Sequence, residues 1–178
     1  GSRNVFREFM TAHRGTVTGH AETVIGDDNL FMAYAHVAHD CIVGSRNVFA
    51  NSASLSGHVV VEDDVVLGGF AVVRQFCRVG RFAYVGGMTP VNKDVLPFTW
   101  TSSDRDTKAY KINAVGLSRK GYSPDRVSSL QKAYRILHRN RHDHAAILAS
   151  LGELAESAPD VRVLLDFITS SKAGIHGA

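Results

Sequence analysis

The sequence predicts a mainly β protein, a parallel β-helix followed by a C-terminal α-helical cap domain. The main observation is a six-residue repeat, because an aliphatic or aromatic residue occupies every sixth position from residue 25 to residue 91. Helical and alternating-strand patterns do not produce this spacing, whereas the hexapeptide repeats of a β-helix do. The repeat stops beside a proline, and helical periodicity follows it. The recurring large residues are Ile25, Phe31, Val37, Val43, Phe49, Leu55, Val61, Leu67, Val73, Val79, Val85 and Val91.

A small or short residue follows each large one after four positions, as at Ala35 and Ala53. Three hexads make one triangular coil, in which the large residue fills the interior and the small one fits the corner. Cys41 and Cys77 occupy the same column, two coils apart. Coils stack about 4.8 Å apart, so the two thiols should lie about 10 Å apart, which is too far for a disulfide. Two buried free thiols are consistent with a reducing compartment.

Residues 1–98 are predicted to form the β-helix. The repeat is already present in residues 4–17, where Phe6 and Ala12 are six positions apart. Its register shifts by one before Ile25, so residues 18–23 should form a loop that leaves a coil corner. The chain opens with Gly1 and Ser2, lacks an initiator Met and begins in mid-repeat, so we expect further N-terminal coils to precede it.

Residues 99–122 are predicted to be a connecting loop. The repeat ends at Leu96-Pro97-Phe98, because proline lacks the N–H that a strand ladder requires. The residues that follow show neither strand nor helix periodicity and include a polar run over 101–106. This segment should return along the outside of the coils.

Residues 123–178 are predicted to form a helical domain. Ser123, Pro124 and Asp125 combine an N-cap, a proline at the first helical position and an early acidic residue. Three apolar faces at helical spacing follow, and Pro159 closes the second. Because an uncapped coil exposes its backbone groups, these helices should cap the solenoid and contribute an oligomer contact. The three faces are Val127, Leu130, Tyr134 and Leu137; Ile147, Leu148, Leu151 and Leu154; and Val161, Leu164, Leu165 and Ile168.

Composition places the chain among ordinary soluble proteins. It has 178 residues, is 44% hydrophobic and 21% charged, and carries a net charge of +3. No apolar run approaches the roughly 20 residues that cross a membrane, and no signal peptide is visible. Basic residues do not cluster with aromatic ones, so nucleic-acid binding is not expected. We therefore expect a cytoplasmic protein without a membrane span.

The repeat brings several polar residues to one edge of the predicted solenoid. Residues eighteen apart share a column, so His39, Gly57 and Gln75 stack, and Asp40 and His58 stack beside them. Ser56 and Arg74 form a third column next to these two. The edge thus presents a base, a carboxylate, a glycine N–H and a cation. Acyl transfer to a hydroxyl requires a general base and a donor for the oxyanion.

Simpler interpretations of these residues remain open. A histidine at a coil corner is most often a solvated polar residue, and a glycine there often only makes the turn. A metal site is the rival use of His36, His39 and His58, since three imidazoles are a common zinc set.

Seven segments together match one known family: AHVAHDC at 35–41, ASLSGHV at 53–59, RQFC at 74–77, VGG at 85–87, FREF at 6–9, HRGT at 13–16 and NAVGL at 113–117. They resemble the UDP-N-acetylglucosamine O-acyltransferase family of lipid A biosynthesis, and the resemblance covers essentially the whole chain. This resemblance implies a left-handed β-helix that assembles as a homotrimer with its sites between subunits. It also implies transfer of a 3-hydroxyacyl chain from acyl carrier protein to the 3-hydroxyl of a UDP-sugar. No cofactor is implied beyond the phosphopantetheine that the carrier protein bears.

The resemblance also implies residue roles. His39 corresponds to the general base, Asp40 to the carboxylate that polarises it, and Gly57 to the oxyanion donor. His58 corresponds to a residue near the donor arm, and Gly87 to the position where side-chain size limits acyl length. Further substrate contacts are implied for His36, Arg74, Gln75, Asn113 and Arg119. No metal is implied.

Two residues depart from the family pattern, and three alternatives remain. Arg74 stands where members commonly have histidine, and Val115 where many have an acidic residue, so the acceptor sugar is less well defined than the acyl transfer. The alternatives are the related N-acyltransferase of the same pathway, a zinc-dependent hexapeptide enzyme such as a γ-type carbonic anhydrase, and a non-catalytic trimeric scaffold or inactive fragment.

Overall fold

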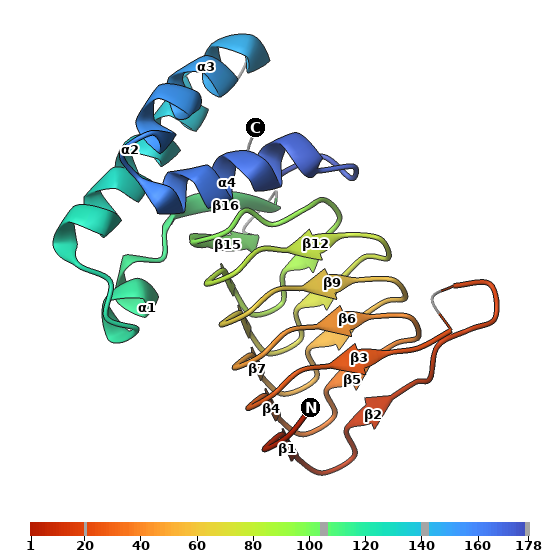
Figure 1. Ribbon diagram of the computed structural model, residues 1–178. Coiled ribbons are helices and arrows are strands. Elements are labelled where there is room, and N and C mark those ends of the chain that lie inside the picture. The colour runs from red at the N-terminus through yellow and green to blue at the C-terminus, as the bar shows by residue number, and fades with distance from the viewer. Residues whose placement is uncertain (20, 104–106, 140–142, 177–178) are drawn as a thin grey trace.

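The computed structural model describes residues 1–19, 21–103, 107–139 and 143–176, and shows a stack of triangular coils with helices at its C-terminal end (Figure 1). Short strands form the three sides of each coil. Along the described chain, strands β1 to β14 contain two residues each: β1 Val5–Phe6, β2 Thr11–Ala12, β3 Val24–Ile25, β4 Leu30–Phe31, β5 His36–Val37, β6 Ile42–Val43, β7 Val48–Phe49, β8 Ser54–Leu55, β9 Val60–Val61, β10 Val66–Leu67, β11 Val72–Val73, β12 Arg78–Val79, β13 Tyr84–Val85 and β14 Pro90–Val91.

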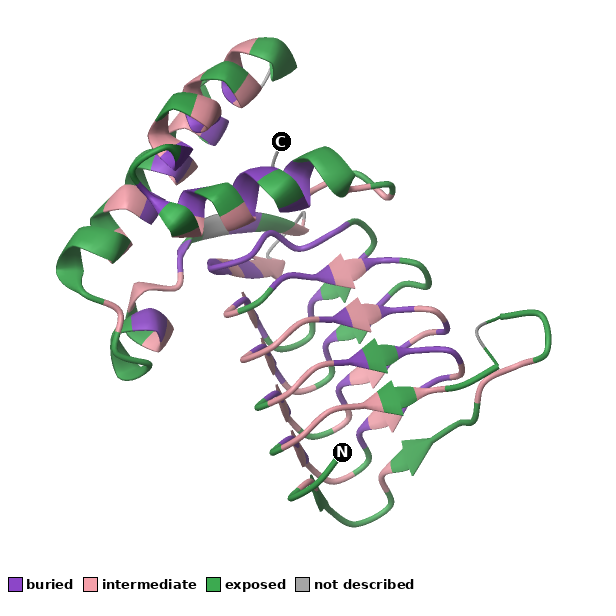
Figure 2. Cartoon of the chain, viewed as in Figure 1, coloured by how far each residue is buried: buried purple, intermediate pink, exposed green. Residues whose placement is uncertain are grey.

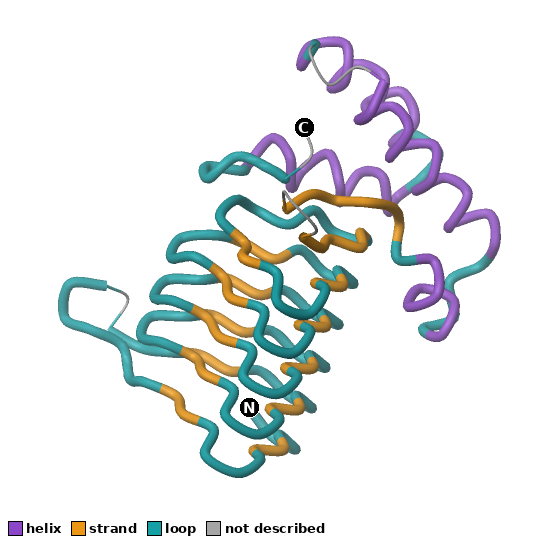
Figure 3. Tube along the Cα trace, turned by 180° about the vertical axis from the view of Figure 1, so that it is seen from behind, coloured by secondary structure: helices purple, strands orange, loops and turns teal. Residues whose placement is uncertain are grey.

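Strands β1 to β14 pair in parallel in three sheets and form the parallel β-helix predicted from the repeat, which the family resemblance implies to be left-handed. Sheet A has the order β1-β4-β7-β10-β13-β15-β16, sheet B has β14-β11-β8-β5-β2, and sheet C has β12-β9-β6-β3. The last two strands of sheet A, β15 Thr99–Ser103 and β16 Thr107–Ile112, pair antiparallel. Seen from behind, the strands stack in columns with loops between them (Figure 3). Leu30 pairs with Val48, and Val48 with Val66, which confirms the eighteen-residue coil.

The predicted loop over 18–23 is confirmed for the residues that the structure describes there, 18–19 and 21–23. Val5 pairs with Leu30, so the first coil is seven residues longer than those after it. The described part of this segment leaves the solenoid between β2 and β3 as a protruding loop (Figure 1). We call residues 16–19 and 21–23 the inserted loop.

The hexads determine which side chains enter the core. The second residue of each strand from β4 to β14 is almost completely buried, as are the small corner residues (Figure 2). From Asn29 to Thr89, the residue before each small one turns the corner with a positive φ, for example 58° at Asp40 and 61° at His58. Non-glycine residues adopt this conformation only where the surrounding structure imposes it. Stacked strands provide that constraint here.

The two cysteines are buried and free, as predicted. Burial, with a smaller contribution from Asp94, raises the pKa of the Cys77 thiol to about 11. The thiolate is the nucleophilic form, so Cys77 is an inert core residue at neutral pH.

The segment expected to be a loop is partly regular structure, which corrects the prediction for 99–122. It forms β15 Thr99–Ser103 and β16 Thr107–Ile112, an antiparallel pair, and then helix α1 Ala114–Arg119. β15 pairs with β13, so Pro97 ends the hexads but not sheet A. The physical reason is that β13 in the last coil has unpaired backbone N–H and C=O groups, and β15 forms hydrogen bonds with them. Residues 104–106 of the expected loop lie outside the described residues.

Three further helices match the predicted apolar faces: α2 Pro124–Arg139, α3 His144–Ala155 and α4 Pro159–Ser170. Most of their buried residues form one cluster that also includes Leu96, at the last coil, whereas Leu130 of α2 packs in a second cluster with Phe98, Ile112 and Leu117. Helix α4 lies across the end of the solenoid (Figure 1), where the Arg78 guanidinium stacks 4.1 Å from the centre of the Phe167 ring. In the part of the chain that the structure describes, no helix is long and apolar enough to span a membrane.

Candidate active site

The corner between sheets B and C carries the polar columns predicted from the repeat. We call its residues the histidine edge: His39, Asp40, Gly57, His58, Gln75 and Phe76. Pairing of β5 with β8 and of β8 with β11 places these corners on three successive coils. Backbone hydrogen bonds tie them together, from His58 N to the His39 carbonyl at 3.1 Å and from Phe76 N to the Gly57 carbonyl at 3.3 Å.

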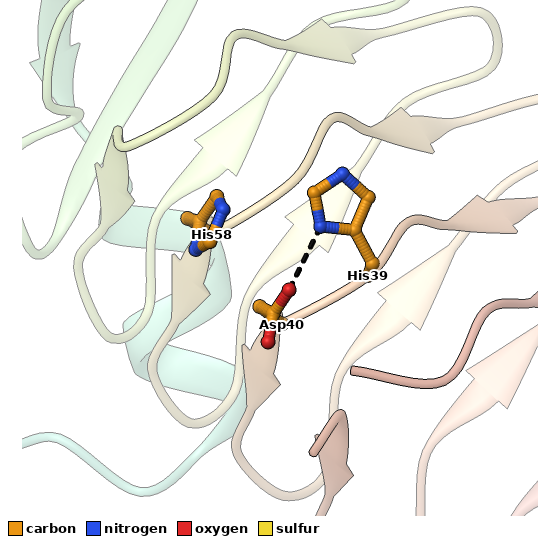
Figure 4. A group of neighbouring side chains, drawn as sticks. All are labelled: His39, Asp40 and His58. Atoms are coloured by element: carbon orange, nitrogen blue, oxygen red, sulfur yellow. Dashed lines mark hydrogen bonds and ion pairs between the residues drawn. The ribbon is translucent and has the colours of Figure 1, made fainter. Parts of the chain in front are cut away.

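His39 and Asp40 form a hydrogen-bonded pair (Figure 4). His39 Nδ1 lies 2.8 Å from Asp40 Oδ2, and the Asp40 side chain is fully buried whereas that of His39 is 41% exposed. With an acceptor-only carboxylate at this distance, the proton is assigned to Nδ1. Nε2 is then left with its lone pair. The pair is therefore arranged as a base with an orienting carboxylate.

The inserted loop holds Asp40 in place. Thr16 donates to the carboxylate from its backbone N at 3.1 Å and from its Oγ1 at 2.7 Å, and Asp40 N donates to Thr23 Oγ1 at 2.9 Å. Hydrogen bonds of this kind compensate for burying a carboxylate. The repeat analysis singled out neither threonine, because the loop that brings Thr16 and Thr23 to this corner breaks the hexad register. The register shift before Ile25 was the only sequence signal for a segment reaching this corner.

Gly57 lies directly above the His39 ring. A Cβ atom at Gly57 would stand 2.5 Å from His39 Cε1 and 2.8 Å from Nε2, so only glycine leaves room for the imidazole. No hydrogen bond within the described part of the chain occupies the Gly57 N–H. A base nitrogen and an available N–H donor thus lie side by side.

His58 and Phe76 extend the site toward a cleft. The His58 ring packs edge-on against His39 with centroids 5.2 Å apart and stacks on Phe76 at 4.7 Å. The cleft has a volume of about 650 Å³ and carries two cationic side chains. Its lining residues are Thr18, Gly19, His58, Val60, Phe76, Arg78, Asp94, Ser170 and Lys172.

His36 lies on the outer face of sheet B instead of at the corner. Its Nδ1 is 2.8 Å from Thr11 Oγ1, and its ring meets His13 edge-on at 4.8 Å. Burial, and then the neighbouring His13, lower the pKa of His36, which favours the neutral imidazole. Arg74 is exposed near the outer face of sheet B, and Gln75 is exposed at the histidine edge.

The remaining predicted residues lie on the other two edges. Gly87 is at the corner between sheets A and B, where a Cβ would stand 3.2 Å from the Gly69 carbonyl oxygen. Asn113 is the N-cap residue of α1, and Arg119 is its last residue. The helix is fixed at the corner between sheets C and A by the ion pair of Lys120 and Asp64, whose charged atoms lie 2.7 Å apart. One chain therefore does not bring all the predicted site residues together.

Asn113 already has a structural role. Its Nδ2 donates to the Phe82 carbonyl at 3.0 Å, and its Oδ1 caps α1 by accepting from Gly116 N at 3.2 Å. Arg119 is exposed in the last turn of the same helix.

Comparison with known proteins gives the family of this chain. A model described as UDP N-acetylglucosamine O-acyltransferase, domain 2, matches residues 94–176, and a bacterial transferase hexapeptide model matches residues 22–57. The acyl-[acyl-carrier-protein]–UDP-N-acetylglucosamine O-acyltransferase of Alkalilimnicola ehrlichii is 47% identical over 98% of this chain and 67% of its own length. The chain belongs to the UDP-N-acetylglucosamine O-acyltransferase family.

Solved structures of the acyltransferase family have the same fold. LpxA from Acinetobacter baumannii superposes with a TM-score of 0.93 at 35% identity, over 98% of this chain and 67% of that one. The Moraxella catarrhalis enzyme superposes with a TM-score of 0.92 at 39% identity, over 98% of this chain and 67% of its own. The curated relative from Stenotrophomonas maltophilia is 46% identical, over 94% of this chain and 64% of its own. This chain thus spans about two thirds of the length of these acyltransferases.

The three imidazoles considered as a zinc set do not come together among the described residues of this single chain. The group whose ligand atoms approach one another there contains His39, Asp40 and His58. His36 is not a member, because its strand directs it to the outer face of sheet B. The geometry of one chain therefore does not support a zinc set that includes His36.

Proposed function

We propose that the full-length protein transfers a 3-hydroxyacyl group from acyl carrier protein to the 3-hydroxyl of UDP-N-acetylglucosamine, the first step of lipid A biosynthesis. The observation that carries this proposal is the His39–Asp40 pair beside the Gly57 N–H. Relatives that are 41–47% identical are named for an acyl-carrier-protein donor and a UDP-N-acetylglucosamine acceptor. Buried free thiols fit a cytoplasmic enzyme.

In the proposed step, His39 Nε2 takes the proton of the acceptor hydroxyl as its oxygen attacks the thioester carbonyl. The Gly57 N–H stabilises the resulting oxyanion. Collapse of the tetrahedral intermediate breaks the carbon–sulfur bond, and the His39 imidazolium returns the proton to the departing phosphopantetheine thiol. Asp40 orients the ring and stabilises its charged form. No resident cofactor or metal takes part in this scheme.

The substrates are proposed to occupy surfaces that meet the histidine edge. The cleft beside His58 and Phe76 suits the donor arm, because Arg78 and Lys172 provide positive charge for a phosphate. His36, Arg74 and Gln75 are proposed contacts of the acceptor. Gly87, Asn113 and Arg119 are proposed to come from neighbouring copies in a homotrimer, since they lie on other edges.

Substitution of the base tests the function. In full-length protein, His39→Ala should reduce acyl transfer by roughly 10²–10⁴-fold, which is the usual contribution of a general base. The measurement is the rate of ester formation from a 3-hydroxyacyl carrier protein and UDP-N-acetylglucosamine. His144→Ala, which removes an exposed imidazole from α3, is the matched control and should retain the full rate. Near-normal turnover of His39→Ala would refute the mechanism.

A further inference from the structure

The histidine edge brings together three groups that are ligands for transition metals. His39, Asp40 and His58 each offer one ligand atom, and these atoms all lie within 4.8 Å of one another. Figure 4 shows the two imidazoles on either side of the carboxylate. Imidazole nitrogen with carboxylate oxygen is a donor set that suits Zn²⁺, Co²⁺ and Ni²⁺.

Two of the three side chains are held before any ligand arrives. Asp40 is fixed by Thr16, and the His58 ring by its stack on Phe76. Hydrogen bonds that orient ligand carboxylates and imidazoles raise metal affinity. The backbone bond from His58 N to the His39 carbonyl, at 3.1 Å, fixes the two coils relative to each other.

Only small movements are needed to complete the coordination. Zinc binds nitrogen and oxygen at about 2.0–2.2 Å, so its tetrahedral ligands lie closer to one another than the widest separation here. The His39 side chain is 41% exposed, and its ring would exchange the hydrogen bond to Asp40 for a bond to the cation as it turns. Three protein ligands leave a fourth position for water or a substrate group.

We propose that a divalent transition-metal cation of the zinc type binds to His39, Asp40 and His58 and inhibits the protein. The cation competes with the proton for the imidazole of His39, so a metal-bound chain lacks its base. Binding is inferred from the grouping of the three ligand atoms, whereas inhibition also rests on the proposed function. The site is thus a point of control by metal and not a cofactor site.

Titration with Co²⁺ tests the site directly. Metal-free, full-length protein without a histidine tag is titrated while the visible d–d absorption is followed, and Zn²⁺ is then added as a competitor. We expect one Co²⁺ per chain in the wild type and in His36→Gln, which removes a nearby imidazole outside the group. His58→Gln should weaken binding at least about 10-fold. Absence of binding, or equal affinity in wild type and His58→Gln, would overturn the inference.

A second measurement separates this inference from the proposed function. Acyl transfer is assayed for each protein with and without Zn²⁺, and EDTA is added at the end. Reversible inhibition at the Zn²⁺ concentrations that displace Co²⁺ supports the inference, and an unaltered rate in the metal-bound wild type overturns it. Failure of the metal-free protein to transfer acyl groups would refute the proposed function, while the Co²⁺ titration would still report on the metal site.

Discussion

At the scale of single residues, Gly57 shapes the site through its lack of a side chain. In Gly57→Ala the methyl group would lie 2.5 Å from His39 Cε1, so the imidazole must move. We expect the turnover number to fall by about 10²–10³, the cost of disturbing an oxyanion donor. The melting temperature should change little, because the displaced ring is partly exposed. Steady-state kinetics and a thermal melt measure both effects, and a normal turnover number would exclude this role for Gly57.

Gly87 leads to a prediction about acyl length. Its position is exposed, beside Gly69 at the corner between sheets A and B, so a groove can continue past it. Each further methylene buried should add about 0.8 kcal/mol to donor binding. Gly87→Met should therefore shift preference from long to shorter 3-hydroxyacyl donors by filling the groove.

Donors of graded length measure this effect, and Gly87→Ala is the control that should keep most of the preference for long chains. Unchanged ratios of rates on long and short donors in Gly87→Met would show that Gly87 serves only as a turn residue.

Sequence reasoning succeeded for residues inside the repeat. The eighteen-residue period placed His39, Gly57 and Gln75 on one edge, since residues in one column must stack. It did not reveal Thr16, because no period relates the inserted loop to the corner at Asp40. Nor did it show that Asn113 caps α1, a contact that depends on where the helix begins.

At the scale of secondary structure elements, the hairpin of β15 and β16 shows why the connecting segment was misjudged. Thr99 and Thr101 are buried in β15, yet both are polar and the strand has only five residues. Alternation this short and this polar does not distinguish a strand from a loop. The apolar faces of α2, α3 and α4 were long enough to be recognised. What made β15 a strand was the unpaired edge of β13, which only the folded coil presents.

The C-terminal segment makes a pH-dependent contact with the last coil. His176 Nδ1 donates to the Thr107 carbonyl at 3.0 Å, and its Nε2 accepts from Asn92 N at 3.3 Å and Lys93 N at 3.1 Å. Burial lowers the pKa of His176, and Lys93 acts in the same direction. Hydrogen bonding to Thr107 and the charge of Asp94 oppose this shift, but the net direction is downward. A proton on Nε2 would remove both backbone bonds.

This contact predicts a loss of stability in mild acid. Below about pH 6.5, His176 binds a proton in the unfolded chain more readily than in the folded one. The free energy of unfolding therefore falls as the pH decreases. Above that pH the imidazole is neutral in both states and the contribution is complete. Urea unfolding at pH 7.5 and pH 5.5, compared between wild type and His176→Ala, measures it. The variant should lose less stability on acidification, and equal losses in both proteins would contradict the prediction.

At the scale of the whole molecule, the proposed site residues occupy three different edges of one solenoid. Exposed apolar side chains accompany them, with Phe70 62% and Met88 79% exposed at the corner of Gly87. Such exposure is typical of a surface that another chain covers. These observations support the proposed trimer with shared sites.

Mixed oligomers test site sharing. His39→Ala and Arg119→Ala should each be inactive alone, whereas their co-expression should restore about a quarter of the sites if the two residues come from different copies. His39→Ala with Asp40→Asn is the control, because both changes affect the same edge of one chain and no intact site can form. Light scattering gives the mass of the assembly. Activity from a monomer, or no recovery in the first mixture, would argue against a shared site.

Gly69 and Gly87 stand one above the other on neighbouring coils, joined by the hydrogen bond from Met88 N to the Gly69 carbonyl at 2.8 Å. Coils repeat at about 4.8 Å, so equivalent positions along one edge of the solenoid are spaced at that interval. Along this edge, a bulky side chain placed at Gly69 instead of Gly87 would shift the blocked end of the acyl groove by the height of one coil. Acyl selectivity in such a protein should therefore change in steps the height of one coil, and point substitutions in one column would be enough to retune it.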